Sequence, residues 1–156
     1  MEMVTVLNED LIARVTDAAL QSPRGRMNFN FHSGPEDNPH RFLNVMLRGT
    51  YVQPHRHLNP PKAEAFLALR GSGCVVTFDD AGAVTERYFI GEGQPSLGVD
   101  IAAGVWHTVI PGSDVLVCYE VKPGPWDPST DKEFAAWAPA EGSRDVERYV
   151  SGILNL

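Results

Sequence analysis

A short helical pattern near the start of the chain gives way to a long series of strand patterns. The apolar positions of residues 9–20 lie three and four apart, which is the spacing of one helix face: Leu11, Ile12, Val15, Ala18 and Ala19. Asn8 precedes this stripe, and Glu9 and Asp10 fall in its first turn. We therefore predict a helix over 9–20 with Asn8 as its N-cap, ending before Pro23.

From residue 41 onward, short apolar runs alternate with turns rich in glycine, proline and aspartate. The predicted strands are 42–47, 50–57, 64–70, 73–79, 83–90, 96–101, 105–110 and 114–122. Many short, closely spaced strands are typical of a sandwich or a barrel. Before them, residues 22–40 read as irregular apart from a short strand at 27–31, and after them residues 144–154 carry a second helical stripe.

These patterns predict one domain over residues 1–156, since no low-complexity linker or repeat divides the chain. We expect an N-terminal helix and extension at 1–40, a barrel at 41–122, and a C-terminal extension at 123–156 that packs on the outside of the barrel. The fold class is therefore mainly β.

Composition narrows the classes of partner. The chain has 20 acidic residues against 13 Lys and Arg, a formal net charge of −7. This balance argues against nucleic-acid binding, which needs a dense basic surface. No apolar run is long enough to cross a bilayer, and Met1-Glu2-Met3 lacks the pattern of a signal peptide, so we expect a cytoplasmic protein without a membrane partner. Cys74 and Cys118 lie in apolar runs, where we expect buried, reduced thiols.

The strongest chemical signal is His55-Arg56-His57, followed by Glu64 and much later by His107. Side chains two apart in a strand point to the same face, so His55 and His57 aim together into the fold. Glu64 opens the next predicted strand, and closure of a small barrel would return His107 beside them. We interpret these four residues as metal ligands.

Three imidazoles and one carboxylate suit a divalent transition metal such as Zn, Fe, Mn or Ni. Four protein ligands on a six-coordinate ion leave two positions for water or substrate, which is an option for catalysis. The alternative is a structural zinc, although such sites usually favour cysteine.

A resemblance to a known family strengthens this interpretation. Gly49, His55-Arg56-His57, Glu64 and Gly71 resemble the first cupin motif, and Gly104 and His107 resemble the second. Two departures are a six-residue gap between His57 and Glu64, where most cupins have three or four, and Ala102 in place of the usual proline. The resemblance implies a cupin (jelly-roll) β-barrel with an N-terminal helix and short C-terminal helices.

A closer resemblance is to the WbuC-type cupin-fold metalloproteins, a family found around O-antigen and surface-polysaccharide biosynthesis. It extends over nearly the whole chain, through these segments: Ser22-Pro23-Arg24-Gly25-Arg26, Asn30-Phe31-His32, Tyr51 to His57, Glu64-Ala65-Phe66, Trp106-His107-Thr108, Glu120 to Pro125 and Phe134 to Glu141. The resemblance carries His55, His57, Glu64 and His107 over as ligands, and cupins in general imply a homodimer, which would involve the helix at 9–20.

Several polar residues are candidates for binding a substrate. Arg24 and Arg26 would offer guanidinium groups to a phosphate or carboxylate, or else pair with some of the protein's own acidic residues. Asn30 would line the mouth of the site or lie at the surface. Gln53 and Tyr51 share parity with His55, so we expect both to face the interior, Gln53 as a hydrogen-bond donor to a bound ligand.

Two residues are candidates for moving a proton. His32 belongs to the pattern around Asn30, and Glu120 lies in the last predicted strand, where it shares a face with Lys122. The alternatives are a surface role for His32 and an ion pair between Glu120 and Lys122 on an edge strand.

Three functions fit these features. The first is a metal-dependent isomerase or epimerase acting on a small polar molecule, such as a sugar or nucleotide-sugar of surface-polysaccharide metabolism. The second is an Fe(II)-dependent oxygenase with the same ligands. The third is a non-catalytic sugar-binding or regulatory cupin. The ligand in each case is a small molecule, anionic or a sugar.

Overall fold

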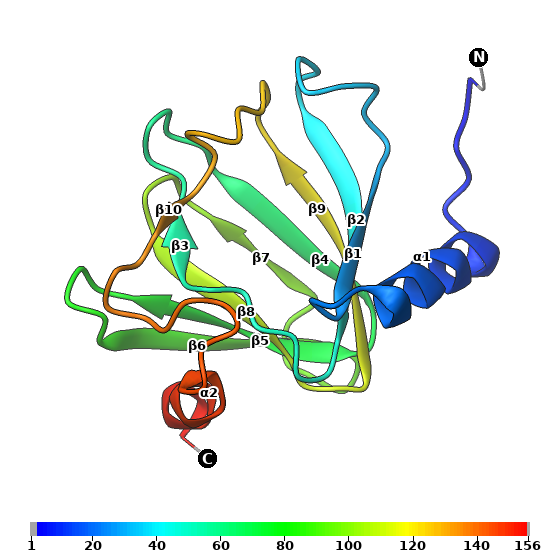
Figure 1. Ribbon diagram of the computed structural model, residues 1–156. Coiled ribbons are helices and arrows are strands. Elements are labelled where there is room, and N and C mark those ends of the chain that lie inside the picture. Colours follow the sequence, from blue (N-terminus) through cyan, green and yellow to red (C-terminus); the bar gives the residue numbers. More distant parts are fainter. Residues whose placement is uncertain (1–2, 156) are drawn as a thin grey trace.

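Two antiparallel sheets and two helices make up the computed structural model, which describes residues 3–155 (Figure 1). In chain order the elements are α1 (Glu9–Gln21), β1 (Arg26–Asn30), β2 (His40–Leu47), β3 (His55–Arg56), β4 (Glu64–Arg70), β5 (Ser72–Phe78), β6 (Val84–Gly91), β7 (Gly98–Ile101), β8 (Trp106–Pro111), β9 (Val115–Lys122), β10 (Glu133–Phe134) and α2 (Val146–Leu154). The mainly β prediction is confirmed.

The sheets face each other as a jelly-roll sandwich. Sheet A has the strand order β1-β2-β9-β4-β7, and sheet B has the order β10-β3-β8-β5-β6. Among the strands that the structure describes, none belongs to both sheets, so the expected closed barrel is replaced by two packed layers. The distant segments still meet, because face-to-face packing brings the two inner surfaces together.

Buried apolar residues form three clusters, one between the sheets and one on each outer face. One cluster, which includes Met46, Val75 and Leu116, joins the inner faces of both sheets. A second packs α1 against the outer face of sheet A, and a third packs α2 and residues 135–138 against the outer face of sheet B. The two helices therefore lie on opposite outer faces of the sandwich (Figure 1).

Both helical stripes form helices. Asn8 caps α1 as predicted, because its side-chain oxygen accepts a hydrogen bond of 3.0 Å from the Leu11 N–H. The second helix begins at Val146, two residues later than its pattern suggests, and buries Ile153 against sheet B. Neither helix in the described part of the chain has the length and apolar character needed to cross a membrane.

The predicted strand at 50–57 is mostly wrong, since only His55–Arg56 pairs as a strand. Side chains take the carbonyl groups that a sheet neighbour would use. Arg26 Nη1 donates to the Tyr51 carbonyl, Thr108 Oγ1 donates to the Val52 carbonyl, and the Gln53 carbonyl lies 2.9 Å from His55 Nδ1. Residues 50–54 consequently form no regular strand, and the two-residue alternation of a strand does not hold there.

The inner faces change character along the strands. Leu116, Cys118, Glu120 and Lys122 alternate along β9, and the first two belong to the cluster between the sheets. Glu120 and Lys122 therefore also point inward, at the opposite end of the strand. All four of these side chains are buried. The sandwich thus has an apolar interior at one end and a polar interior at the other, and the polar end holds the candidate site.

Candidate metal centre

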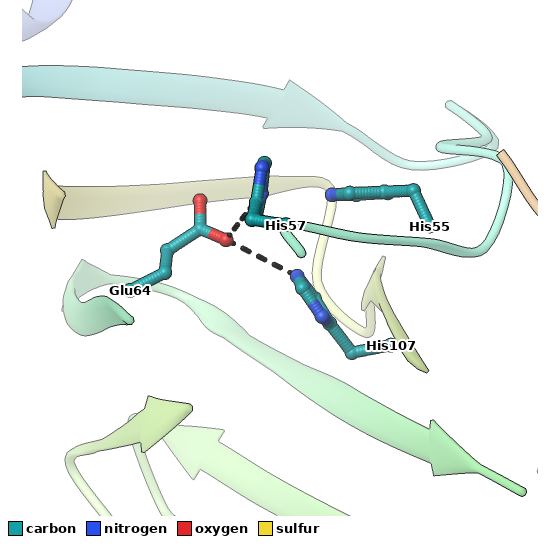
Figure 2. A group of neighbouring side chains, drawn as sticks. All are labelled: His55, His57, Glu64 and His107. Carbon is teal, nitrogen blue, oxygen red and sulfur yellow. Dashed lines mark hydrogen bonds and ion pairs between the residues drawn. The ribbon is translucent and has the colours of Figure 1, made fainter. Parts of the chain in front are cut away.

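Four buried side chains converge at the polar end of the sandwich (Figure 2). His55 lies on β3 with His57 just after that strand, Glu64 is the first residue of β4, and His107 lies on β8, where it pairs in register with His55. One ligand atom from each residue lies within 4.8 Å of the others. His57 and His107 are 2% and 1% exposed, so the group is shielded from solvent.

The backbone selects one tautomer for all three histidines. Nδ1 of His55 lies 2.9 Å from the Gln53 carbonyl oxygen, and Nδ1 of His107 lies 2.8 Å from that of Val105. Nδ1 of His57 contacts the carbonyl oxygen of Asp131. A carbonyl can only accept, so each Nδ1 carries the proton and each Nε2 keeps its lone pair. This is the arrangement found in metal-binding histidines.

The Nε2 atoms then need a cation between themselves and the carboxylate. Glu64 Oε2 lies 3.0 Å from His57 Nε2 and 3.1 Å from His107 Nε2. Two neutral imidazoles would direct their Nε2 lone pairs at an anion, which is an unfavourable arrangement. It becomes stable if both rings are protonated or if the three groups share a metal ion. His57 Nε2, moreover, is buried without a hydrogen-bond partner within residues 3–155. The donor set fits a divalent transition metal.

The electrostatics of the four residues agree with this fit. Burial, and then the neighbouring His107, hold the pKa of His55 well below its ordinary value, so its ring is neutral and able to ligate. Burial alone would raise the pKa of Glu64, but positive charge at the Nε2 positions of His107 and His57 outweighs it and holds that pKa well below the ordinary value. The carboxylate therefore stays ionised inside the protein.

The long gap between His57 and Glu64 forms a turn that leaves both residues at the site. Leu58 and Pro61 pair as an isolated bridge, and the Lys62 N–H donates to the His57 carbonyl oxygen at 3.3 Å. The extra residues therefore loop out, and β4 still begins at Glu64. The six-residue gap does not displace the carboxylate.

Residues 7–90 match the sequence family described as Domain of unknown function (DUF6016), which is more than half of the chain. The chain belongs to this family. The matched region contains His55, His57 and Glu64 but ends before His107. No curated protein is significantly similar to the DUF6016 protein in sequence.

Solved structures resemble this DUF6016 protein in fold. The capsular polysaccharide assembling protein CapF from Staphylococcus aureus has a TM-score of 0.60 and 22% identity over 72% of this chain and 30% of its own. L-ribose isomerase from Cellulomonas parahominis has 0.56 and 16% over 72% and 70%. A variant of oxalate decarboxylase from B. subtilis has 0.53 and 16% over 70% and 27%. The DUF6016 chain spans less than a third of the length of CapF. The three likenesses together establish a cupin-type fold.

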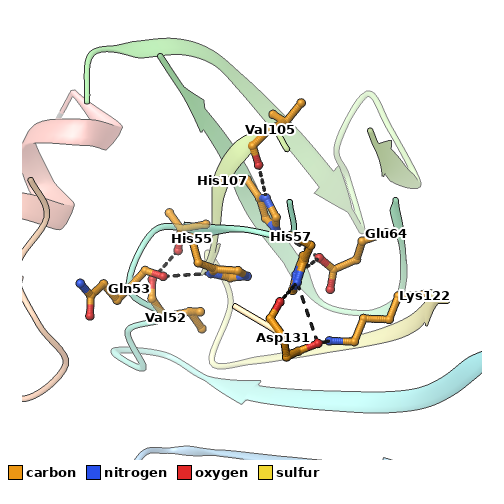
Figure 3. A network of polar contacts seen from close by, with 10 residues as sticks. Val52, Gln53, His55, His57, Glu64, Val105, His107, Lys122 and Asp131 are labelled. Atoms are coloured by element: carbon orange, nitrogen blue, oxygen red, sulfur yellow. Dashed lines mark hydrogen bonds and ion pairs between the residues drawn. The ribbon is translucent and has the colours of Figure 1, made fainter. Parts of the chain in front are cut away.

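A buried ion pair includes Asp131, the residue whose carbonyl oxygen contacts His57 (Figure 3). Asp131, whose carbonyl oxygen contacts His57 Nδ1, also holds Lys122 Nζ with both carboxylate oxygens, at 3.0 and 3.1 Å. Both side chains are less than a tenth exposed. The expected ion pair between Glu120 and Lys122 on an edge strand is wrong, because β9 lies in the middle of sheet A and Lys122 pairs with Asp131.

Glu120, predicted to move a proton, lies in the interior near the four residues. It is 3% exposed, and its Oε2 has no hydrogen-bond partner among the described residues. Burial, and then the charge of Glu64, raise its pKa well above the ordinary value. The protonated form of Glu120 is therefore favoured relative to that of an exposed glutamate, which suits a proton donor.

His32 makes a different set of contacts. Its ring stacks on His40 with 3.9 Å between centroids, and its Nδ1 accepts a hydrogen bond of 3.1 Å from the Arg41 N–H. His40 in turn lies 3.0 Å from the Pro35 carbonyl oxygen. Within residues 3–155, the hydrogen-bond and ring partners of His32 include none of the four converging residues. Its catalytic role stays a prediction.

The two candidate arginines are engaged by the protein's own acid. Glu141 accepts from Arg26 Nη1 and Nη2 at 2.9 Å each and from Arg24 Nε at 3.1 Å. Arg26 also holds the Tyr51 carbonyl, so the three charges tie the C-terminal segment to β1. Substrate binding by Arg24 and Arg26 stays a prediction, and the alternative of internal pairing is the one that the contacts favour.

The side chains of Gln53 and Tyr51, both expected to face the interior, contact the C-terminal segment instead of the four converging residues. Ligand binding by Gln53 stays a prediction. Gln53 Nε2 donates to the Ala135 carbonyl oxygen at 3.1 Å, and its side chain points away from the histidines (Figure 3). Tyr51 OH donates to the Pro139 carbonyl oxygen at 2.8 Å. Both residues thus hold the C-terminal segment, because residues 50–54 lack strand alternation. Asn30, on the edge strand β1, is exposed, and its role in binding stays a prediction.

Sequence reasoning missed Asp131 and Lys132, which lie just before β10. β10 pairs with β3, with Phe134 opposite His55 and Glu133 opposite Arg56. This pairing brings the segment alongside the histidines, although it lies 74 residues after His57 in the chain. The only sequence signal was the neighbouring stretch from Phe134 to Glu141, which carries no metal-ligand pattern of its own.

Proposed function

We propose that this DUF6016 protein binds a divalent transition metal through His55, His57, Glu64 and His107 and acts on a small polar molecule in an isomerase- or epimerase-like reaction. One observation carries the proposal: the backbone directs three Nε2 lone pairs and one ionised carboxylate at a common point inside the protein. A structural zinc is less well supported, since the set contains no cysteine.

The metal and the residues of the chain would have different roles in the reaction. A bound metal supplies Lewis-acid polarisation of a carbonyl or enediolate oxygen. Glu120, whose raised pKa favours the protonated acid, would hold or deliver a proton beside that oxygen. The burial of the four ligands would keep water away from the reacting atoms.

Two considerations support a sugar or nucleotide-sugar of surface-polysaccharide metabolism as the substrate class. The sequence resembles WbuC-type cupins, and the fold resembles those of a capsular polysaccharide assembling protein and a ribose isomerase. Membership of the WbuC group, the homodimer and a cytoplasmic location belong to the same proposal.

Metal binding is the first test. Protein purified without added metal, and apo protein reconstituted anaerobically with Mn²⁺, Fe²⁺, Co²⁺, Ni²⁺ or Zn²⁺, should hold about one ion per chain by elemental analysis. His57→Ala should weaken binding by more than about a hundredfold, because loss of an outer contact alone costs 10- to 100-fold in metal sites. His32→Ala serves as the control and should bind as the unaltered protein does. Equal affinity of His57→Ala and the unaltered protein would refute the site.

Proton transfer is the second test. The metal-loaded protein is incubated in D₂O with a panel of aldoses, ketoses and nucleotide-sugars, and NMR follows deuterium incorporation beside the carbonyl carbon. Incorporation that needs the metal and falls in Glu120→Gln is expected. Oxygen uptake that depends on substrate would instead identify the Fe(II)-dependent oxygenase. Ligand binding without either reaction would identify a sugar-binding cupin.

A further inference from the structure

The lysines of the chain gather at one place. The sequence contains only three, at positions 62, 122 and 132. Lys122 points into the polar end of the sandwich from β9, and Lys62 lies buried in the turn before Glu64. Lys132 lies between Asp131, which contacts His57, and the start of β10. A protein with a net charge of −7 therefore carries all its lysines on segments that hold or contact the candidate ligands or Asp131.

Two of these lysines already have partners. Lys122 is paired with both carboxylate oxygens of Asp131, and Lys62 Nζ donates to the Pro125 carbonyl oxygen. Lys132 is different: none of the ion pairs formed by residues 3–155 includes it. No carboxylate of the described residues lies within ion-pair distance of its ammonium group.

The residues on either side of Lys132 show where it lies. Glu133, the next residue, pairs with Arg56 on the outer face at 2.8 Å. Asp131, just before Lys132, contacts His57 through its carbonyl oxygen, and Phe134, two residues after it, has its ring centroid 6.2 Å from that of His55. The backbone at Lys132 therefore runs beside both histidines. Burial, and then the charge of Lys122, lower the pKa of Lys132, and Glu64, Asp131 and Glu120 are near enough to oppose that shift. A partly buried ammonium without an anion is costly unless a ligand supplies one.

We propose that Lys132 recognises a carboxylate of the substrate, held with its charge between the ammonium group and the metal position. The proposal rests on the metal site proposed above. A single ammonium group matches the single charge of a carboxylate, whereas phosphate is more often held by several donors or by arginine forks. The substrate class is therefore a small carboxylate-bearing molecule, such as a sugar acid.

The test compares a carboxylate with its neutral amide. Protein loaded with Co²⁺ is titrated with glycolate and with glycolamide, and the visible absorption of the metal reports binding. The unaltered protein should prefer glycolate. Lys132→Gln should bind glycolate about tenfold more weakly, the effect of one well-placed charge interaction, and should bind glycolamide unchanged. Lys132→Arg keeps the charge and should retain part of the preference. Arg48→Gln removes an exposed positive charge and should have no effect.

The outcomes separate the two proposals. Failure of the unaltered protein to bind Co²⁺ would refute the metal site. Normal Co²⁺ binding together with equal affinity for glycolate and glycolamide, or with full glycolate affinity in Lys132→Gln, would overturn the role of Lys132 alone. Co²⁺ stoichiometry and circular dichroism check that each variant is folded. If Lys132→Gln does not fold, the preference of the unaltered protein and of Lys132→Arg for glycolate decides the matter.

Discussion

The two ends of the sandwich interior are built from the same strands but have opposite chemistry. On β9, Leu116 and Cys118 lie in the apolar cluster, and Glu120 and Lys122 lie at the polar end. On β2, Met46 belongs to the apolar cluster, and His40 lies buried at the polar end. The apolar end gains stability by removing hydrocarbon from water, whereas the polar end retains buried charges that need partners. One end therefore holds the sheets together, and the other is free to carry the site.

The apolar end should give the largest effect on stability and little effect on metal binding. Leu116 is fully buried in the cluster between the sheets. Leu116→Ala removes hydrocarbon and leaves a cavity, so we expect a loss of about 3–4 kcal/mol in the free energy of unfolding. Urea unfolding measures this loss, with Leu97→Ala as the control because Leu97 is 76% exposed. Folded Leu116→Ala should still bind metal at full stoichiometry, and loss of the metal would contradict the division between the two ends.

Breaking the ion pair between Asp131 and Lys122 should give the next largest loss of stability. Asp131→Asn leaves the Lys122 ammonium buried without its carboxylate, which costs about 3 kcal/mol for a buried pair. Metal affinity should also fall about tenfold, because the pair between the Asp131 carboxylate and Lys122 fixes the backbone carbonyl that contacts His57 Nδ1. Urea unfolding and metal titration measure the two effects.

Glu133→Gln is the matched control for this change. It breaks the neighbouring pair with Arg56, in which the Glu133 side chain is 47% exposed, and it should cost less than about 1 kcal/mol. Equal losses from the two variants would mean that the buried pair contributes no more than a surface one.

The sequence predicted the parts of the molecule that depend on local periodicity. The helix cap at Asn8, the inward direction of His55 and the start of β4 at Glu64 all follow from spacing within a few residues, and the structure confirms them. The regular strand at 50–54 was wrong, because Arg26 and Thr108 take carbonyl groups that a sheet would have used.

The remaining parts of the site depend on contacts between distant segments. Asp131 reaches His57 only through the pairing of a two-residue strand, β10, with β3. A strand of two residues is too short to produce a periodic pattern in the sequence. The pairing of Arg24 and Arg26 with Glu141 likewise joins residues more than a hundred positions apart. Residue types suggested charges that needed partners, but only the tertiary structure selects which partner each one has.

The smallest expected effect is on the pH dependence of stability, and it concerns Glu120 at the polar end in metal-free protein. Its folded pKa is raised above the ordinary value of 4.5 by burial and by Glu64, so the folded state holds the proton more tightly than the unfolded chain does. The stability from this group is present below pH 4.5 and is lost as the pH rises through the folded pKa. Glu120→Gln stays neutral throughout, so its stability relative to the unaltered protein should be greater at about pH 8 than at about pH 5. Urea unfolding at both values measures the difference, with exposed Glu92→Gln as the control. An equal difference at the two pH values would show that Glu120 is not held as the neutral acid.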